Sequence, residues 1–213
     1  MKRKNLDSYN SKEDIKKAAI EEFVLRGKHG ARMEQIGQRA KINKAMIYYY
    51  YSTKDNLYNE VMEVVVTAFY SKVRGGIQKL FEKNTDEIII LKELINIYLE
   101  TISVNGKYMK VFFDALTHEP DNVSDILKKF KEKSNFPAPE KVITFLEDGM
   151  NRGIFKKTNP QQIIINIISV CFFYFFAKPI LNTLLGIDGD EEKVILKNRN
   201  ENVTDFLMNG ILA

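Results

Sequence analysis

The chain has 213 residues, enough for a large hydrophobic core and for one or two domains. Hydrophobic residues make up 45% of it and charged residues 28%, the ordinary balance of a soluble globular protein. Its single cysteine, Cys171, excludes an internal disulfide and a cysteine-based metal cluster, and its basic, polar start lacks the apolar segment of a secretory signal, so we expect a cytoplasmic protein.

The net charge of +4 is distributed unevenly along the chain. Residues 1–60 hold 13 Lys or Arg against 8 Asp or Glu, whereas the remainder holds 19 against 20. A segment with excess positive charge attracts the phosphate backbone of nucleic acids. A solvated basic surface would have the same balance, so the charge alone does not decide between the two.

The chain begins with ten basic and polar residues, which we predict to be a flexible arm of the kind that can reach a DNA groove. A helix follows over residues 11–26, with Ser11 as its N-cap and an apolar stripe at helical spacing. Gly27 and Gly30 then suit a left-handed C-cap and a loop.

Two short helices are predicted next, over residues 33–40 and 44–51, separated by a tight turn. Asn43 is placed to cap the second helix, which carries four consecutive tyrosines, and Thr53 to cap a further one. A short helix pair whose second member exposes cationic and hydroxyl groups is a candidate helix-turn-helix for the major groove of DNA. On spacing alone, two ordinary helices of an all-helical domain explain the same pattern.

Six further helices are predicted in the middle of the chain, at residues 57–74, 77–83, 86–104, 108–116, 124–133 and 140–152. The break between the first two is placed at Gly75-Gly76, and a later one at Asn105-Gly106. In the third helix, Ile89 and Leu94 are expected to point inward. Strict alternation of apolar and polar residues is scarce, so the predicted fold class is all-α.

The most apolar stretch of the chain is residues 161–185. Its longest part without a charge or a proline, residues 163–177, is shorter than the roughly 20 residues that a bilayer requires, so we predict a buried helix rather than a membrane span. A helix that is apolar all round must be covered on every side, and a partner subunit would supply that cover. A last helix is expected over residues 191–208, with Val194 and Phe206 among its apolar positions.

Catalytic and metal-binding equipment is sparse in the sequence. There are two histidines, His29 and His118, and no third ligand stands at metal-site spacing from either of them. Gly75-Gly76 lacks the Lys-Ser/Thr of a phosphate-binding loop, and Cys171 lies in an apolar run that suits a core residue. We therefore expect neither an enzyme, nor a cofactor, nor a metal site.

The residues from the first predicted helix to Leu57, taken in their order along the chain, resemble the pattern of a known protein family. The run Ile36, Ala40-Lys41-Ile42-Asn43-Lys44, Ile47-Tyr48, Tyr51 and Lys54-x-x-Leu57 resembles the TetR family of helix-turn-helix transcriptional regulators over roughly residues 11–60. The resemblance implies a DNA-binding head at residues 1–56 and a helical-bundle body for effector binding and dimerisation at residues 57–213.

The resemblance also implies roles for individual residues. Ile47 and Tyr51 match the buried positions that hold the recognition helix, and Tyr48 matches a tyrosine whose hydroxyl meets a phosphate. Lysine and tyrosine are suitable donors to phosphates, and Lys44 near the helix N-terminus can donate to guanine. The full set of expected DNA-contacting residues is Arg32, Asn43, Lys44, Ala45, Met46, Tyr48, Tyr49, Tyr50 and Lys54.

Three positions depart from the family pattern. Arg32 stands where a threonine usually caps the first of the two short helices, so weaker capping is expected there. Lys41 stands in the turn where a glycine is usual, and it would be strained if that position has a positive φ. Ala45 replaces a frequent glycine, which favours the helix.

In the family the helical body encloses an effector and its last two helices form the homodimer interface. The aromatic-rich body of this chain suits a small, mostly apolar molecule. The implied function is a repressor that binds a palindromic operator as a homodimer and is released by the effector; the alternative is a helical protein-interaction domain without specific DNA binding. The expected effector contacts are Tyr98, Tyr108, Phe112, His118, Phe145, Asn166 and Phe173.

Overall fold

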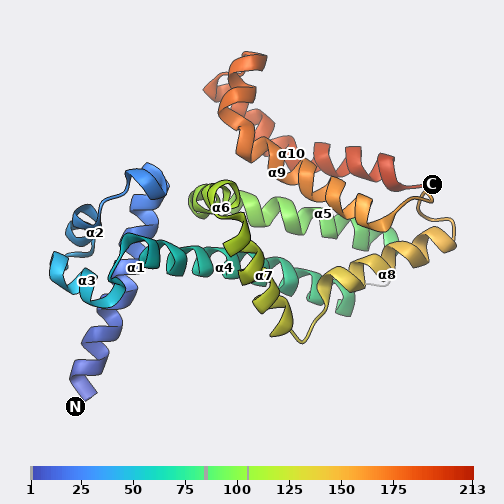
Figure 1. Ribbon diagram of the computed structural model, residues 1–213. Helices are drawn as coiled ribbons and strands as arrows, with labels where there is room; N and C mark the ends of the chain where they lie inside the picture. The colour runs from blue at the N-terminus through green and yellow to red at the C-terminus, as the bar shows by residue number, and fades with distance from the viewer. Residues whose placement is uncertain (1, 84–85, 105) are drawn as a thin grey trace. The chain divides into compact units, whose positions relative to one another are not determined.

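The computed structural model describes residues 2–83, 86–104 and 106–213. Ten α-helices make up nearly all of this described part, which confirms the predicted all-α fold (Figure 1). The contacts between residues divide the chain into two compact units, residues 1–69 with 105–133 and residues 70–104 with 134–213. The helices are α1 (Lys2–Gly30), α2 (Met33–Ala40), α3 (Lys44–Tyr51), α4 (Lys54–Lys83), α5 (Glu87–Val104), α6 (Gly106–His118), α7 (Pro120–Glu132), α8 (Ala138–Asn151), α9 (Pro160–Leu185) and α10 (Gly189–Ile211).

The N-terminal arm is a correction to the sequence prediction. α1 begins at Lys2, so Ser11 lies inside the helix instead of capping it. Residues 2–10 contain neither proline nor glycine, and an existing helix extends at little cost. The side chains of the first ten residues lie outside the described set. The predicted left-handed C-cap and loop at Gly27 are not found: its φ of 65° and ψ of 177° interrupt the helical geometry, but α1 continues to Gly30.

The core of the first unit forms where α1 packs on α2, α4 and α6. α1 contributes Ile15 and Phe23, both buried, and the Phe23 ring meets the Tyr58 ring of α4 edge-on at 5.0 Å between centroids. The buried side chain of Tyr58 donates a hydrogen bond from its hydroxyl to Asp114 of α6 at 2.7 Å. α6 thereby becomes part of the same compact unit as the two short helices.

α4 is a single helix of 30 residues, so the predicted break at Gly75-Gly76 is wrong. Glycine is a poor helix former, but its cost of about 1 kcal/mol per residue can be overridden by packing. A Cβ atom added at Gly76 would lie 3.1 Å from a side-chain carbon of Ile97 in α5. Gly76 therefore permits a close approach of α4 to α5 within the second unit. α7 likewise differs from its prediction, because Pro120 at its first position starts the helix before residue 124.

The second unit packs α5 against α9 and α10, with α8 alongside α9. Leu94 of α5 is buried as predicted, whereas Ile89 is exposed. The Phe155 ring, which follows α8, packs directly on Gly149 of that helix. A Cβ atom at Gly149 would lie only 2.2 Å from this ring, so the packing requires glycine. Phe155 also forms an isolated antiparallel bridge with Leu212 near the end of the chain.

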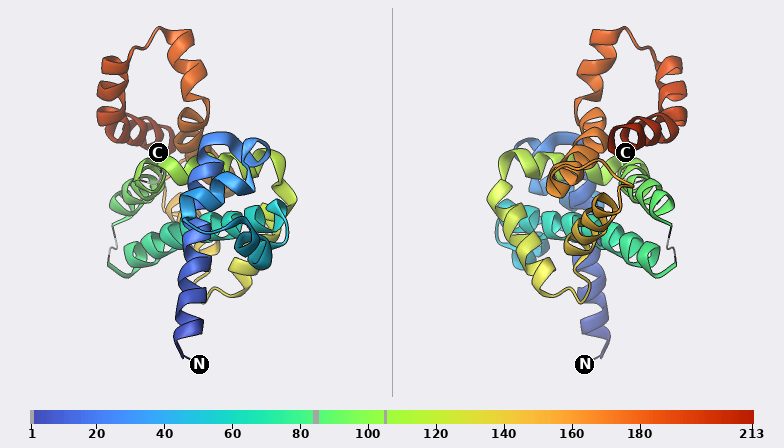
Figure 2. Two further views of the ribbon diagram at one scale, coloured as in Figure 1. Left: turned by 90° about the vertical axis from the view of Figure 1, so that its left-hand side faces the viewer. Right: turned by 90° about the vertical axis from the view of Figure 1, so that its right-hand side faces the viewer.

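α9 and α10 are connected by a turn whose residue Gly186 has a positive φ of 68° (Figure 2). By length and composition alone, α9 could cross a membrane, as many core and interface helices of soluble proteins could. Only 28% of its most apolar window is buried within the chain, so the chain itself covers one side of this helix. Val194 and Phe206 of α10, predicted as apolar positions, are also exposed.

Candidate nucleic-acid interface

The two short helices α2 and α3 are held together at Gly37. A Cβ atom at this position would lie 2.9 Å from the carbonyl oxygen of Ile42 and 3.0 Å from Cδ1 of Ile47. Such distances are too short for a side chain, so the crossing of the two helices requires glycine here. Gly37 was not among the predicted functional residues, although a glycine inside a short helix signals a close approach.

The ends of α3 follow the sequence prediction closely. The side chain of Asn43 accepts a hydrogen bond from the Met46 amide at 2.8 Å and caps the helix. The hydroxyl oxygen of Thr53 accepts one from the Asn56 amide at 3.1 Å at the start of α4. Lys41 has a φ of 56°, the left-handed conformation that is strained for a side chain larger than glycine. Arg32 makes no side-chain cap hydrogen bond to α2, as its departure from threonine predicts.

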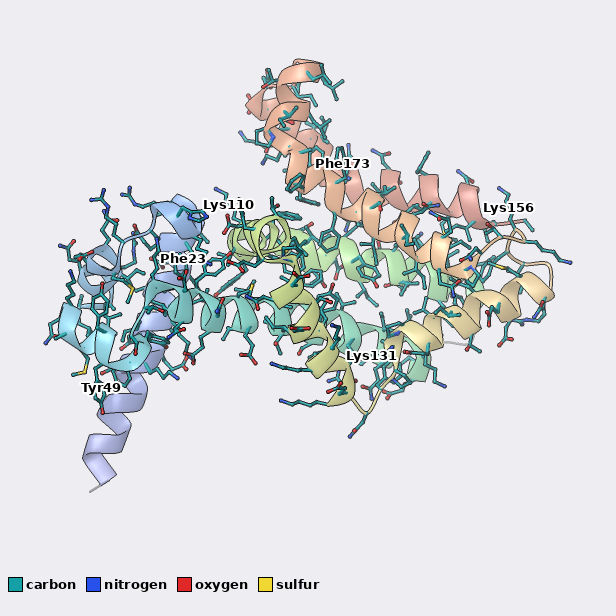
Figure 3. The ribbon with its side chains drawn as sticks, in the orientation of Figure 1. Phe23, Tyr49, Lys110, Lys131, Lys156 and Phe173 are labelled. Atoms are coloured by element: carbon teal, nitrogen blue, oxygen red, sulfur yellow. The ribbon has the colours of Figure 1, made fainter. Side chains whose placement is uncertain are left out.

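α3 has one buried face and one exposed face. Ile47 is 0% exposed and Tyr51 is also buried, which fixes the helix against its neighbours, as predicted. Tyr49, labelled in Figure 3, is 78% exposed. The exposed or half-buried surface of α3 and its flanks includes all nine residues of the expected DNA-contacting set: Arg32, Asn43, Lys44, Ala45, Met46, Tyr48, Tyr49, Tyr50 and Lys54.

The exposed face also contains a carboxylate that the sequence analysis missed. Glu34 of α2 forms an ion pair with the Nζ atom of Lys44, and this nitrogen lies 5.7 Å from the centre of the Tyr48 ring. The hydrogen bond between the two side chains lowers the pKa of Glu34 and raises the pKa of Lys44. Both groups are therefore charged at neutral pH. The base-reading candidate Lys44 is therefore paired with Glu34.

Lys54 is held by the end of α1. Its Nζ atom donates hydrogen bonds to the carbonyl oxygens of His29 and Ala31, both at 3.1 Å. These carbonyls are at the C-terminal end of α1, where a cation is favoured by the helix dipole. Because an ammonium group has three N–H donors, one remains for a phosphate.

A network of polar side chains joins these helices to α6 and α7. Lys28 of α1 pairs with Asp55 of α4 at 3.2 Å and with Glu119 at the α6–α7 junction, and its Nζ atom lies 5.0 Å from the centre of the Tyr58 ring. Burial alone would lower the pKa of Lys28, but the hydrogen bonds to the two carboxylates raise it above its usual value. His118, expected as an effector contact, lies in the same region, with its ring 5.9 Å from that of His29.

Two family models match this chain. The model described as "Bacterial regulatory proteins, tetR family" matches residues 15–61, and the model described as "Tetracyclin repressor-like, C-terminal domain" matches residues 90–213. The HTH-type transcriptional repressor SCO4008 of Streptomyces coelicolor is 40% identical over 191 residues, which cover 86% of this chain and 88% of that protein. The chain belongs to the TetR family. It is thus a helix-turn-helix transcriptional regulator.

Other relatives agree with this assignment to the TetR family. The HTH-type transcriptional repressor NicS of Pseudomonas putida is 25% identical, over 84% of this chain and 82% of its own length. The crystal structure of the transcriptional regulator SCO4942 of S. coelicolor has the same fold, with a TM-score of 0.66 and 17% identity over 94% of this chain and 98% of its own. The names of these relatives describe regulators of transcription and not enzymes.

The expected effector contacts of this TetR-family chain are divided between its two compact units. Tyr108, Phe112 and His118 belong to the first, and the other four to the second. Phe112 is buried against Phe69, with 5.1 Å between ring centroids, and Phe145 is buried against Phe81 and Phe155. In contrast, Phe173 is 59% exposed and Tyr108 is also exposed. Asn166 accepts a hydrogen bond from Gln162 one turn earlier in α9. Their role in effector binding stays a prediction.

Proposed function

We propose that the chain is a repressor that binds a palindromic operator as a homodimer and leaves it when a small, mostly apolar molecule binds the helical body. The observation that carries the DNA-binding part is the two-sided character of α3. Ile47 and Tyr51 fix the helix from within, while Lys44, Tyr48 and Tyr49 present a cation and hydroxyl groups outward. These groups suit guanine acceptors and phosphate oxygens in the major groove.

The homodimer joins two recognition helices at a spacing of about 34 Å, one turn of DNA. Residues 1–56 act as the DNA-binding head, and residues 57–213 bind the effector and dimerise. The exposed apolar side chains of α9 and α10, among them Phe176, Ile180 and Phe206, support a dimer interface on these two helices. We place this regulator in the cytoplasm, where its operator is found.

Release from DNA follows from coupling between two sites. An effector that binds the body more tightly in one conformer favours that conformer, and a changed spacing of the heads lowers operator affinity. Linkage requires that DNA weaken effector binding by the same factor. Repression as the outcome is supported by the names of SCO4008 and NicS, both described as repressors.

A gel-shift assay with the DNA upstream of the chain's own gene tests the proposal at fixed salt. Lys44→Ala is expected to weaken binding by about 1–3 kcal/mol, because it removes a base contact. Tyr48→Phe, which removes one hydroxyl donor, is expected to weaken it by about 1 kcal/mol. Lys128→Ala is the control, since Lys128 is an exposed residue of α7 paired with Asp125. Binding that is insensitive to salt and to both variants would favour the alternative, a protein-interaction domain.

A further inference from the structure

Arg199 of α10 lies against α9 without a carboxylate partner among the residues that the structure describes. One of its terminal nitrogens donates a hydrogen bond to the carbonyl oxygen of Val170 at 2.9 Å. Its central guanidinium carbon lies 4.3 Å from the centre of the Tyr174 ring and 5.8 Å from that of Phe175. The guanidinium thus lies over the Tyr174 ring and close to Phe175, and these contacts restrict the directions of its remaining donors.

The polar atoms around Arg199 are buried and incompletely bonded. Its Nε atom and the hydroxyl of Tyr174 are both buried without a hydrogen-bond partner. Tyr174 itself is 7% exposed. Burial lowers the pKa of Arg199, because it removes hydration from the charged guanidinium. A buried Nε donor and a buried hydroxyl without hydrogen-bond partners are costly, and an anion that contacts both would offset that cost.

Cys171 and Tyr98, two ionisable residues in this region, supply no negative charge. Cys171, one turn before Tyr174, is fully buried and lies within electrostatic reach of both Arg199 and Tyr98. Burial raises the pKa of Cys171 to about 12 and that of Tyr98 to about 12, so both groups are neutral at physiological pH. The described neighbours of the guanidinium thus include two aromatic rings, a backbone carbonyl and a neutral thiol.

We propose that Arg199 and Tyr174 form an anion-binding end of the effector site, and that the effector is a monocarboxylate with an apolar or aromatic body. This inference rests on the proposed effector-responsive function. One guanidinium and one phenol match the single charge and the two oxygens of a carboxylate, whereas a phosphate dianion would require further cations.

The test measures the unfolding temperature of the full-length chain with decanoate, with phenylacetate, and with the primary amide of each. Both acids, or the one whose body fits, should stabilise the parent protein more than the matching amide does. In Arg199→Gln, the affinity for the acid should fall about 10- to 100-fold, since a charge-assisted pair is lost. Arg199→Lys should keep an intermediate affinity, because the charge remains without the planar fork. Arg152→Gln is the control, since Arg152 pairs with Glu87 at 2.5 Å elsewhere in the second unit.

Tyr174→Phe keeps the aromatic ring under the guanidinium and removes only the hydroxyl, so it tests the site even if the Arg199 variants do not fold. We expect a loss of acid affinity of roughly threefold to tenfold. The proposal is overturned if acid and amide stabilise equally, if neither acid stabilises the parent protein, or if the variants respond to the acid as the parent does. It is also overturned if Arg199→Gln separates the dimer while the acids have no effect.

A gel shift run in parallel separates this proposal from the proposed function. Acid-dependent stabilisation without release of DNA would support the anion site and contradict release by the effector. Release of DNA by the amide as readily as by the acid would support the effector-responsive function and contradict the anion site.

Discussion

The short helix α3 and the long helix α9 both expose large side chains, but their exposed atoms differ in kind. α3 presents tyrosine hydroxyls next to Lys44, so its exposed surface ends in polar atoms. α9 presents Phe176 and Ile180, which carry no polar atom. Hydroxyls and ammonium groups are satisfied by water until a phosphate replaces it, whereas a contiguous apolar surface is stable only when another apolar surface covers it. The atoms at the tip of an exposed side chain therefore decide whether it is stable in water or requires an apolar partner surface.

The largest effect is expected when exposed apolar side chains of α9 are replaced by charged ones. In Phe176→Glu/Ile180→Glu, each dimer would bury four carboxylates without partners, at several kcal/mol each. We expect the dimer dissociation constant to rise at least about 1000-fold. Sedimentation should then show a monomer of 24.7 kDa. Leu25→Glu is the control, since Leu25 is an isolated apolar residue of α1 that is 66% exposed. A double variant that stays dimeric at micromolar concentration would refute the interface.

The buried face of α3 should contribute to the stability of the protein, whereas its exposed face should contribute little. Ile47→Ala removes a fully buried side chain and should lower the free energy of unfolding by about 2–5 kcal/mol. Tyr49→Ala, on the exposed face, should change it by no more than about 0.5 kcal/mol. Chemical denaturation followed by circular dichroism measures both. Equal losses in the two variants would mean that α3 is not held by its inner face.

Removal of the negative charge next to Lys44 should increase the affinity for the operator. Glu34 engages Lys44 and places a negative charge where phosphates are expected, so Glu34→Gln should tighten operator binding by roughly threefold to tenfold. Gel shifts at several salt concentrations measure this gain. Glu132→Gln, at the end of α7, is a control for the loss of one negative charge and should have a smaller effect. Weaker binding in Glu34→Gln would show instead that Glu34 positions Lys44 for the bases.

The smallest expected effect concerns the turn before α3. Lys41→Gly relieves the positive φ of 56°, which costs a non-glycine residue about 1–2 kcal/mol, but glycine loses more chain entropy on folding. The two terms nearly cancel, and we expect a net gain below about 1 kcal/mol. A small rise in the unfolding temperature would confirm it, with Lys12→Gly in the regular part of α1 as a destabilised counterpart. A lower unfolding temperature for Lys41→Gly would show that the lysine side chain contributes to the turn.

The sequence was sufficient for α3 because every signal there is local. The Asn43 cap, the buried Ile47 and the left-handed Lys41 all depend on residues within one or two turns. α4 was different: its continuation through Gly75-Gly76 depends on Ile97, a residue about twenty positions away, which local propensity cannot detect.

The candidate effector residues could not be sorted by sequence at all. Phe112 and Phe173 have similar apolar neighbours in the chain, yet one is buried and the other is exposed. Arg199 could not be predicted as a site residue, because an arginine in a polar helix normally points into water. Only the placement of Tyr174 beneath its guanidinium distinguishes it.

The composition of the first compact unit has a consequence for synthesis. Residues 1–69 pack with residues 105–133, through contacts such as Tyr58 with Asp114. While the chain emerges from the ribosome, the unit that contains α2 and α3 is therefore incomplete until α6 and α7 have been made. At the usual pace of translation, the 64 residues between positions 69 and 133 take roughly 3–13 s. A newly made head is thus incomplete for seconds, and we expect cotranslational chaperones to meet it during that time.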